Sequence, residues 1–169
     1  MLLRGRTHKF GNDISTDYII ASKYKARALD LEEMAKHVME DADPNFASKL
    51  SVGDFIVAGT NFGCGSSRET APRVIKIAGV SAVLARGFAR IFFRNAINIG
   101  LPVVECDTSL IEGGDELEVD LAAGTIRNMT KEVDILIAPL PGVMVELLKD
   151  GGLVEHFKRY RAFNLRSVT

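Results

Sequence analysis

The sequence contains no tryptophan, only two cysteines and three histidines, and almost no net charge. Cys64 and Cys106 allow at most one disulfide, which is unlike a disulfide-built secreted domain, so we expect both to be reduced thiols. The 21 basic and 22 acidic side chains give a formal net charge of −1. Because such a chain has no broad positive field to hold a phosphate backbone, nucleic acid is not an expected partner.

Long apolar runs are also missing. No stretch approaches the roughly 18 apolar residues that a membrane-spanning helix needs, and the basic N-terminus MLLRGRTHKF lacks the apolar segment of a secretory signal. We therefore expect a cytoplasmic protein with no membrane partner. At 169 residues, 47% of them hydrophobic, the chain suits one well-filled core, so residues 1–169 are predicted to form a single domain.

Short apolar runs alternate with amphipathic stretches along the first two thirds of the chain. Strands are predicted at 2–10, 55–58, 82–85 and 102–104, and helices at 30–38, from near the Ser66-Ser67 pair to 77, and at 89–97. A polar loop is predicted through Ser15, Thr16 and Asp17. The last third predicts a hairpin of 116–120 with 125–128, a third strand at 133–137, and helices at 143–149 and 153–160. This order predicts an α/β fold with a mixed sheet, flanking helices and a C-terminal hairpin region.

Residues 61–69 read NFGCGSSRE and connect a predicted strand to a predicted helix. Glycines let a ligand approach the main chain closely, and the unpaired N–H groups at the start of a helix attract an anion. The stretch lacks the Gly-Lys-Ser/Thr ending of a P-loop and the third glycine of a dinucleotide fingerprint, which disfavours a nucleotide. Arg68 offers a planar two-pronged fork and Ser66 and Ser67 offer hydroxyls, a set that suits a small di- or tricarboxylate.

Each of these residues also has a purely structural interpretation. One of the two serines could cap the helix while Arg68 pairs with Glu69 or a surface acid, and Asp17 could be a turn-forming aspartate that bonds its own backbone. The three histidines are scattered and show no metal-ligand spacing, so we predict no metal site in this chain.

Three motifs together carry a resemblance to a known family. GCGSSRE, with NDISTDYII before it and ARGFARIFFRNAINIGLP after it, resembles the small subunits of 3-isopropylmalate dehydratase, which form the swivelling β/β/α domain of the aconitase superfamily. The resemblance covers essentially the whole chain. It implies a hydro-lyase of leucine biosynthesis that moves a hydroxyl between adjacent carbons of a malate-type acid, by dehydration followed by rehydration.

The resemblance also implies roles for individual residues. Ser66 corresponds to the base that removes the carbon-bound proton, Ser67 and Arg68 to the residues that hold a substrate carboxylate, and Asp17 to an active-site aspartate in the proton and hydrogen-bond network. Departure of hydroxide needs a Lewis acid, which in this superfamily is a [4Fe-4S] cluster held by several thiolates. Two cysteines are too few, so we predict no cofactor in this chain and a cluster in a large partner subunit, without which the chain is inert.

Substrate choice is assigned by the resemblance to the loop after Asp17, which here reads SKYKAR over residues 22–27. Thr16, Tyr24 and Arg27 are the predicted substrate contacts in addition to Ser67 and Arg68. A hydrophobic loop suits an isopropyl group, whereas an arginine suits the extra carboxylate of homoaconitase-type substrates.

In those homoaconitase-type relatives the arginine lies two residues past the tyrosine. Here Arg27 lies three past Tyr24, with Lys25 between them, which departs from both patterns. Isopropylmalate is the predicted substrate, with homoaconitate and methyl- or dimethyl-substituted malates as alternatives. Lys25 and Arg27 either read the substrate or reach into solvent. An alternative of another class is a stand-alone carboxylate-binding regulatory module.

Overall fold

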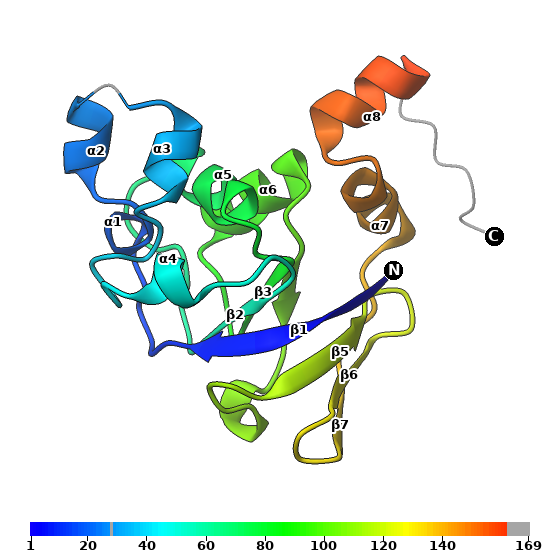
Figure 1. The fold of residues 1–169 in the computed structure, drawn as a ribbon. Coiled ribbons are helices and arrows are strands. Elements are labelled where there is room, and N and C mark those ends of the chain that lie inside the picture. The colour runs from blue at the N-terminus through cyan, green and yellow to red at the C-terminus, as the bar shows by residue number, and fades with distance from the viewer. Residues whose placement is uncertain (28, 162–169) are drawn as a thin grey trace.

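The computed structural model describes residues 1–27 and 29–161 (Figure 1). The elements follow one another as β1 (Leu2–Lys9), α1 (Thr16–Ile19), α2 (Ser22–Ala26), α3 (Leu31–Ala35), α4 (Phe46–Lys49), β2 (Phe55–Ala58), α5 (Thr70–Ile77), β3 (Ala82–Ala85), α6 (Arg90–Ile99), β4 (Val103–Glu105), the 3₁₀ turn η1 (Thr108–Leu110), β5 (Glu116–Asp120), β6 (Thr125–Asn128), β7 (Val133–Leu136), α7 (Gly142–Lys149) and α8 (Leu153–Tyr160).

Seven strands of the described residues form one mixed sheet, in the order β4-β3-β2-β1-β5-β6-β7. β1 to β4 run parallel to one another, and β5, β6 and β7 are antiparallel to their neighbours. In Figure 1 the helices lie on one side of β1–β3 and the antiparallel strands on the other. The predicted α/β class, with its mixed sheet, flanking helices and C-terminal hairpin, is confirmed.

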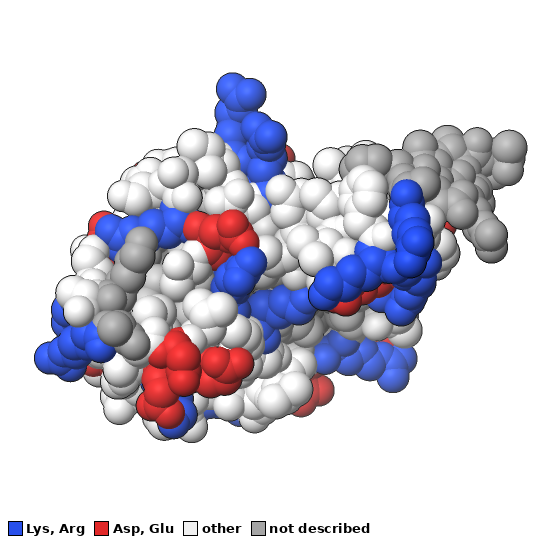
Figure 2. All heavy atoms as spheres, turned by 90° about the horizontal axis from the view of Figure 1, so that it is seen from above, with Lys and Arg blue, Asp and Glu red and all other residues white. Residues whose placement is uncertain are grey.

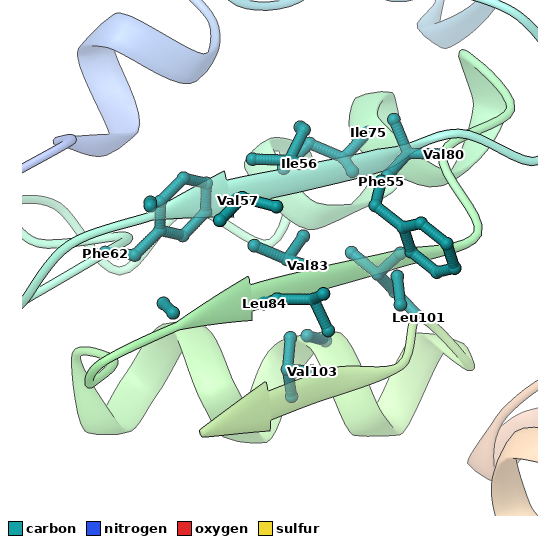
Figure 3. Close-up of a cluster of buried hydrophobic side chains, with 14 of the residues drawn as sticks. Phe55, Ile56, Val57, Phe62, Ile75, Val80, Val83, Leu84, Leu101 and Val103 are labelled. Atoms are coloured by element: carbon teal, nitrogen blue, oxygen red, sulfur yellow. The ribbon is translucent and has the colours of Figure 1, made fainter. Parts of the chain in front are cut away.

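The core is built on the two central strands. All four residues of β2 and all four of β3 are buried, as expected for parallel strands covered on both faces. Figure 3 shows side chains of β2 and β3 packed with Phe62, Ile75 of α5 and Leu101. Burying each side chain of this size contributes roughly 1.5–3 kcal/mol, so these strands form the rigid base from which the adjoining loops extend.

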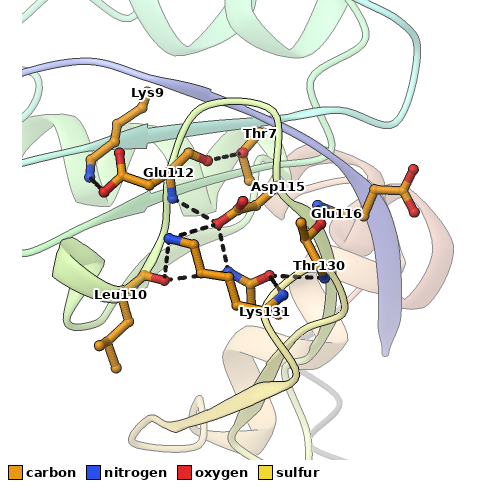
Figure 4. Close-up of polar contacts among 9 residues, drawn as sticks. Thr7, Lys9, Leu110, Glu112, Asp115, Glu116, Thr130 and Lys131 are labelled. Carbon is orange, nitrogen blue, oxygen red and sulfur yellow. Dashed lines mark hydrogen bonds and ion pairs between the residues drawn. The ribbon is translucent and has the colours of Figure 1, made fainter.

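A polar network ties the antiparallel strands to β1 (Figure 4). Asp115 is 5% exposed and accepts hydrogen bonds from the Glu112 amide at 2.8 Å and the Asn128 side chain at 2.7 Å, with Lys131 at 3.4 Å. Burial raises the pKa of Asp115, but these bonds outweigh it and the net pKa lies below its ordinary value. The Thr7 hydroxyl, on β1, donates to the Glu112 carbonyl at 2.6 Å. This bond joins the parallel strand β1 to the segment that leads into the antiparallel strand β5.

The helix predicted to start near Ser66 begins at Thr70 instead, so that boundary was wrong. Pro72 explains the difference, because proline lacks an N–H and is tolerated only in the first turn of a helix. A helix that began at Ser66 would have carried Pro72 in its interior. Ser66 and Ser67 therefore belong to the loop before α5.

Two further segments predicted as loops contain short helices. Thr16 and Asp17 lie in α1, where the Ser15 side chain accepts from the Tyr18 amide, and residues 22–26 form α2. Helices of four or five residues are too short to show a helical period in the sequence. The helix predicted at 30–38 starts as predicted, since the Asp30 side chain caps it by accepting from the Glu33 amide, but α3 ends at Ala35, before the predicted residue 38.

The helical side of the molecule carries charges of both signs. Figure 2 looks down on this side, and acidic and basic side chains lie next to one another on it. Within residues 1–27 and 29–161, no helix is both long enough and apolar enough to cross a membrane.

Candidate functional site

The site predicted from the sequence lies where β1 and β2 end. Parallel strands place their carboxyl ends at one edge of a sheet, where α/β proteins bind ligands. The loop after β1 and the loop after β2 run alongside each other there: the Gly63 amide donates to the Ile14 carbonyl at 2.7 Å, and the Thr16 amide to the Cys64 carbonyl at 2.8 Å. These backbone bonds bring Asp17 next to the Ser66-Ser67-Arg68 stretch.

Gly63 is required by packing within the protein. Its φ is +80°, and a Cβ placed on it would lie 2.2 Å from Cγ of Phe92, on α6. The interpretation that this glycine admits a ligand to the main chain is thus incomplete, because the space beside Gly63 is filled by Phe92. Gly65 also has positive φ, at +90°, and lets the chain turn immediately before Ser66.

Ser66 and Ser67 have exposed side chains, and the Ser66 carbonyl is held by two hydrogen bonds. The Ser66 carbonyl accepts from the Thr16 hydroxyl at 3.1 Å and from the Arg68 amide at 2.7 Å. Neither serine caps α5, whose N-cap residue is Glu69. In the described part of the chain neither hydroxyl has a hydrogen-bond partner, so both are available to a ligand.

Arg68 is held by the segment 17–22. Its Nη1 donates to Asp17 Oδ1 at 2.8 Å and, more weakly, to the Ile20 carbonyl at 3.4 Å, and its Nη2 donates to the Ser22 hydroxyl at 2.8 Å. Of the two structural alternatives, the Arg68–Glu69 pair is not observed, because Glu69 pairs with Arg73. The pair with a surface acid is observed, and that acid is Asp17.

The contacts of Arg68 leave one edge of its guanidinium open. A guanidinium has five N–H bonds, and the contacts to Asp17, Ile20 and Ser22 use two on Nη1 and one on Nη2. The remaining Nη2–H and the Nε–H lie along one edge and have no partner among the described residues. Such an edge matches the two oxygens of a carboxylate, and Arg68 is 23% exposed.

Asp17 is an ionised acceptor in this arrangement. Its carboxylate is 57% exposed and accepts from the Ser22 hydroxyl at 2.9 Å as well as from Arg68. These two hydrogen bonds, that of Ser22 first, hold the pKa of Asp17 below its ordinary value of 3.8. At neutral pH the group is therefore ionised and accepts from Arg68, and its part in a proton-transfer network stays a prediction.

The remaining predicted site residues lie around this centre. Thr16 is buried, and its hydroxyl bonds the Ser66 carbonyl. Tyr24 is 4% exposed and donates to Glu40 at 2.5 Å. Arg27 is exposed, with its guanidinium carbon 6.0 Å from the centroid of the Tyr24 ring. These contacts give Thr16 and Tyr24 supporting positions, and contact of Thr16, Tyr24 or Arg27 with substrate stays a prediction. The side chain of Lys25 lies outside the described residues.

Ser22 was not predicted as a site residue. It stands five positions from Asp17 and 46 from Arg68, and no sequence motif connects the three. The turn between α1 and α2 brings them together.

The thiols do not form a metal-ligand set. Cys64 and Cys106 are both free and partly buried. Burial, with a smaller effect of Asp107, raises the pKa of Cys106 to about 12, so it is a protonated thiol rather than a ligating thiolate. Among residues 1–27 and 29–161, no three histidine, cysteine or acidic side chains come together to hold a metal ion. The described residues thus do not fit an iron–sulfur cluster.

Comparison with known proteins identifies relatives over nearly the whole chain. The aconitase C-terminal domain model matches residues 12–108. The 3-isopropylmalate dehydratase small subunit 2 of Archaeoglobus fulgidus is 58% identical over 160 residues, which cover 95% of this chain and 97% of that protein. Small subunit 1 of the same enzyme from Thermotoga maritima is 52% identical over 163 residues, 96% and 98% of the two chains. The crystal structure of 3-isopropylmalate dehydratase (LeuD) from Methanocaldococcus jannaschii superposes with a TM-score of 0.90 at 46% identity, covering 95% of this chain and 96% of that one.

Proposed function

The chain belongs to the aconitase C-terminal domain family, among the small subunits of 3-isopropylmalate dehydratase, and we propose that it supplies the proton-transfer and carboxylate-binding half of that hydro-lyase. The observation that carries this proposal is 58% identity over nearly all of both chains. The reaction removes water from 2-isopropylmalate to give an enoate and adds it back in the opposite sense to give 3-isopropylmalate, as a step of leucine biosynthesis in the cytoplasm.

Carboxylate binding is assigned to Arg68 and Ser67. The open Nε and Nη2 edge of Arg68 accepts one substrate carboxylate in a two-pronged contact, and the exposed Ser67 hydroxyl adds a third donor. Because Asp17 and Ser22 already hold the other edge, the fork is oriented before substrate arrives, which lowers the entropic cost of binding.

Proton transfer is assigned to Ser66. Its alkoxide oxygen takes the proton from the carbon beside the hydroxyl-bearing carbon and becomes a hydroxyl, the C–H electron pair becomes the double bond, and hydroxide leaves from the neighbouring carbon. In rehydration the serine hydroxyl gives its proton to the carbon that lost hydroxide, and hydroxide adds to the carbon that lost the proton, which restores the alkoxide. A serine acts as a base only if its alkoxide is strongly stabilised, and the cation nearest in sequence is Arg68.

The exposure of Ser66 supports a role for a partner surface. Stabilising an alkoxide also requires exclusion of bulk water, yet Ser66 and Ser67 are exposed in the isolated chain. A second surface must cover them. The names of the relatives refer to a small subunit, which implies a larger partner. We assign both the cover and the [4Fe-4S] cluster to that large subunit, since the thiols of this chain do not fit one.

The side chain of the substrate is the less determined part of the proposal. Arg27 is exposed on the segment directly after α2, within reach of the Tyr24 ring. This placement keeps a tricarboxylate substrate of the homoaconitase type, or a short methyl-substituted malate, as the second candidate.

The test is anaerobic reconstitution with a cluster-loaded large subunit, followed by kcat/KM for isopropylmalate, homoaconitate-type tricarboxylates and methylmalates. We expect isopropylmalate to be preferred. An Arg27→Val variant is then expected to leave that preference unchanged, because Arg27 would face solvent. Arg127→Val, on β6, is the matched control for loss of an exposed arginine.

Other outcomes separate the alternatives. Preference for tricarboxylates that is lost in Arg27→Val would make Arg27 the specificity residue. Carboxylate binding by the isolated chain, with no turnover in the presence of the large subunit, would replace the enzyme proposal by a regulatory module.

A further inference from the structure

We propose that Ser22 is a positioning residue that sets the orientation of the Arg68 guanidinium, so that its open edge meets the substrate carboxylate. This inference rests on the proposed function for its consequence in catalysis. Its structural part concerns three side chains of this chain alone.

The three side chains form a closed ring of hydrogen bonds. Arg68 Nη1 donates to Asp17 Oδ1 at 2.8 Å, Arg68 Nη2 donates to the Ser22 oxygen at 2.8 Å, and the Ser22 hydroxyl donates to the same Asp17 oxygen at 2.9 Å. Only a group that donates and accepts at once can occupy the position of Ser22. Without Ser22, the contacts to Asp17 and, more weakly, to the Ile20 carbonyl would both fall on Nη1 and would leave Nη2 without a partner.

The position of Ser22 is in turn fixed from the other side of α2. Tyr24 donates to Glu40 at 2.5 Å, His37 Nδ1 lies 2.6 Å from the same carboxylate, and the Tyr24 and His37 rings stack at 4.1 Å with an interplanar angle of 13°. We call Tyr24, His37 and Glu40 the α2 clamp. Because Tyr24 is 4% exposed, the clamp anchors α2 by a buried ring and so limits the movement of Ser22, two residues earlier on the same helix.

The protonation states of the clamp support a rigid contact. The hydrogen bond with Tyr24 keeps the pKa of Glu40 below its ordinary value, and the same bond raises the pKa of Tyr24. The phenol thus remains a donor and the carboxylate an acceptor over the neutral range.

Positioning predicts a particular kinetic signature. Arg68 holds the carboxylate before the reaction as well as during it, so loosening this arginine acts mainly on substrate binding: it raises KM and changes kcat less. For Ser22→Ala in the reconstituted complex we expect KM to rise about fivefold, the effect of one hydrogen bond, with kcat within about twofold of wild type. Ser22→Thr retains a hydroxyl and is expected to restore most of the loss.

A second measurement needs no activity. In the isolated chain, the Nε–H signal of Arg68 in side-chain ¹H–¹⁵N NMR spectra reports whether the guanidinium is held. We expect a resolved signal in wild type and Ser22→Thr, and a signal broadened by exchange in Ser22→Ala. Ser48→Ala is the matched control. Like Ser22, Ser48 lies in a short helix and its hydroxyl forms a hydrogen bond, to the Asn45 carbonyl at 2.8 Å, but it has no contact with Arg68.

The outcomes separate this inference from the proposed function. An unchanged Arg68 signal together with an unchanged KM in Ser22→Ala overturns it. A fall in the melting temperature of Ser22→Ala with parallel loss of kcat would make Ser22 merely structural, and would overturn it also. If the wild-type complex turns over no malate-type acid, the proposed function fails, and the NMR comparison still decides whether Ser22 orients Arg68.

Discussion

An aspartate lies beside a nitrogen-containing side chain near each end of the parallel pair β1–β2, but the two aspartates differ in burial. At the amino end, Asp54 is 6% exposed and accepts from His8 Nε2 at 2.9 Å and from the amides of Arg6 at 3.1 Å and Ser51 at 2.9 Å. At the carboxyl end, Asp17 is 57% exposed. The first network ties β1 to β2, and the second orients an arginine at an open edge.

The difference shows how burial divides carboxylates between stability and function. A buried carboxylate whose oxygens are all satisfied costs a great deal to disturb, whereas an exposed ion pair is worth little to stability. The carboxyl edge can therefore keep exposed hydroxyls and an unsatisfied arginine edge, because the fold does not depend on them.

The largest expected effect is on turnover at the carboxyl edge. Ser66→Ala should lower kcat of the reconstituted complex by about 10³-fold, since it removes the proposed base. The free energy of unfolding should change by less than about 0.5 kcal/mol, because the side chain is exposed. Ser67→Ala is the comparison, and it should raise KM instead. Residual activity of Ser66→Ala near that of wild type would remove this serine from the role of base.

A substitution of Gly63 tests whether the loop that carries Ser66 and Ser67 depends on its packing against Phe92 of α6. Gly63→Ala should lower the free energy of unfolding by about 3 kcal/mol, because the new Cβ meets Phe92 and the backbone has positive φ. Gly11→Ala is the control: a Cβ there would meet nothing within 4 Å, and stability should be unchanged or slightly higher. Chemical denaturation of both variants measures the difference, and equal stabilities would contradict the packing of Gly63 on α6.

The two aspartates can be compared directly. Asp54→Asn should cost about 2 kcal/mol of stability at pH 7, since an amide cannot accept all three bonds, and Asp17→Asn should cost less than about 0.5 kcal/mol while raising KM.

The pH dependence gives a second comparison of the same variants. Burial raises the pKa of Asp54, but its hydrogen bonds outweigh burial and hold it below 3.8. A lowered pKa contributes stability that is fully present above the unfolded value and is lost as pH falls through the folded value. The gap between wild type and Asp54→Asn should thus be full near pH 7 and shrink below about pH 4. Denaturation curves at pH 7 and pH 3 check this, and a gap as large at pH 3 as at pH 7 would contradict it.

Much of the fold was predictable because its signals are local. The runs at 55–58 and 82–85 are continuously apolar and became buried parallel strands. Gly100 ends α6 in the left-handed conformation, as its place after the apolar pattern indicates. The start of α5 was predicted too early, near Ser66 and Ser67, because the serine pair resembled a helix cap. The sequence contains the opposite signal in Pro72, since proline is tolerated only in the first turn of a helix.

The sequence by itself determined the family, the mixed α/β class and the stretch that carries Ser66, Ser67 and Arg68, because these depend on residue types at short spacing. Only the tertiary structure decided that Arg68 is held by Asp17 and Ser22, that Gly63 accommodates Phe92 and that Tyr24 is buried against His37 and Glu40. The physical reason is distance along the chain: Arg68 and Ser22 stand 46 residues apart. They meet because the parallel strands β1 and β2 end at one edge of the sheet, and because α1 and α2 turn the chain back toward the loop that carries Arg68. These two helices are too short to show a helical period in the sequence.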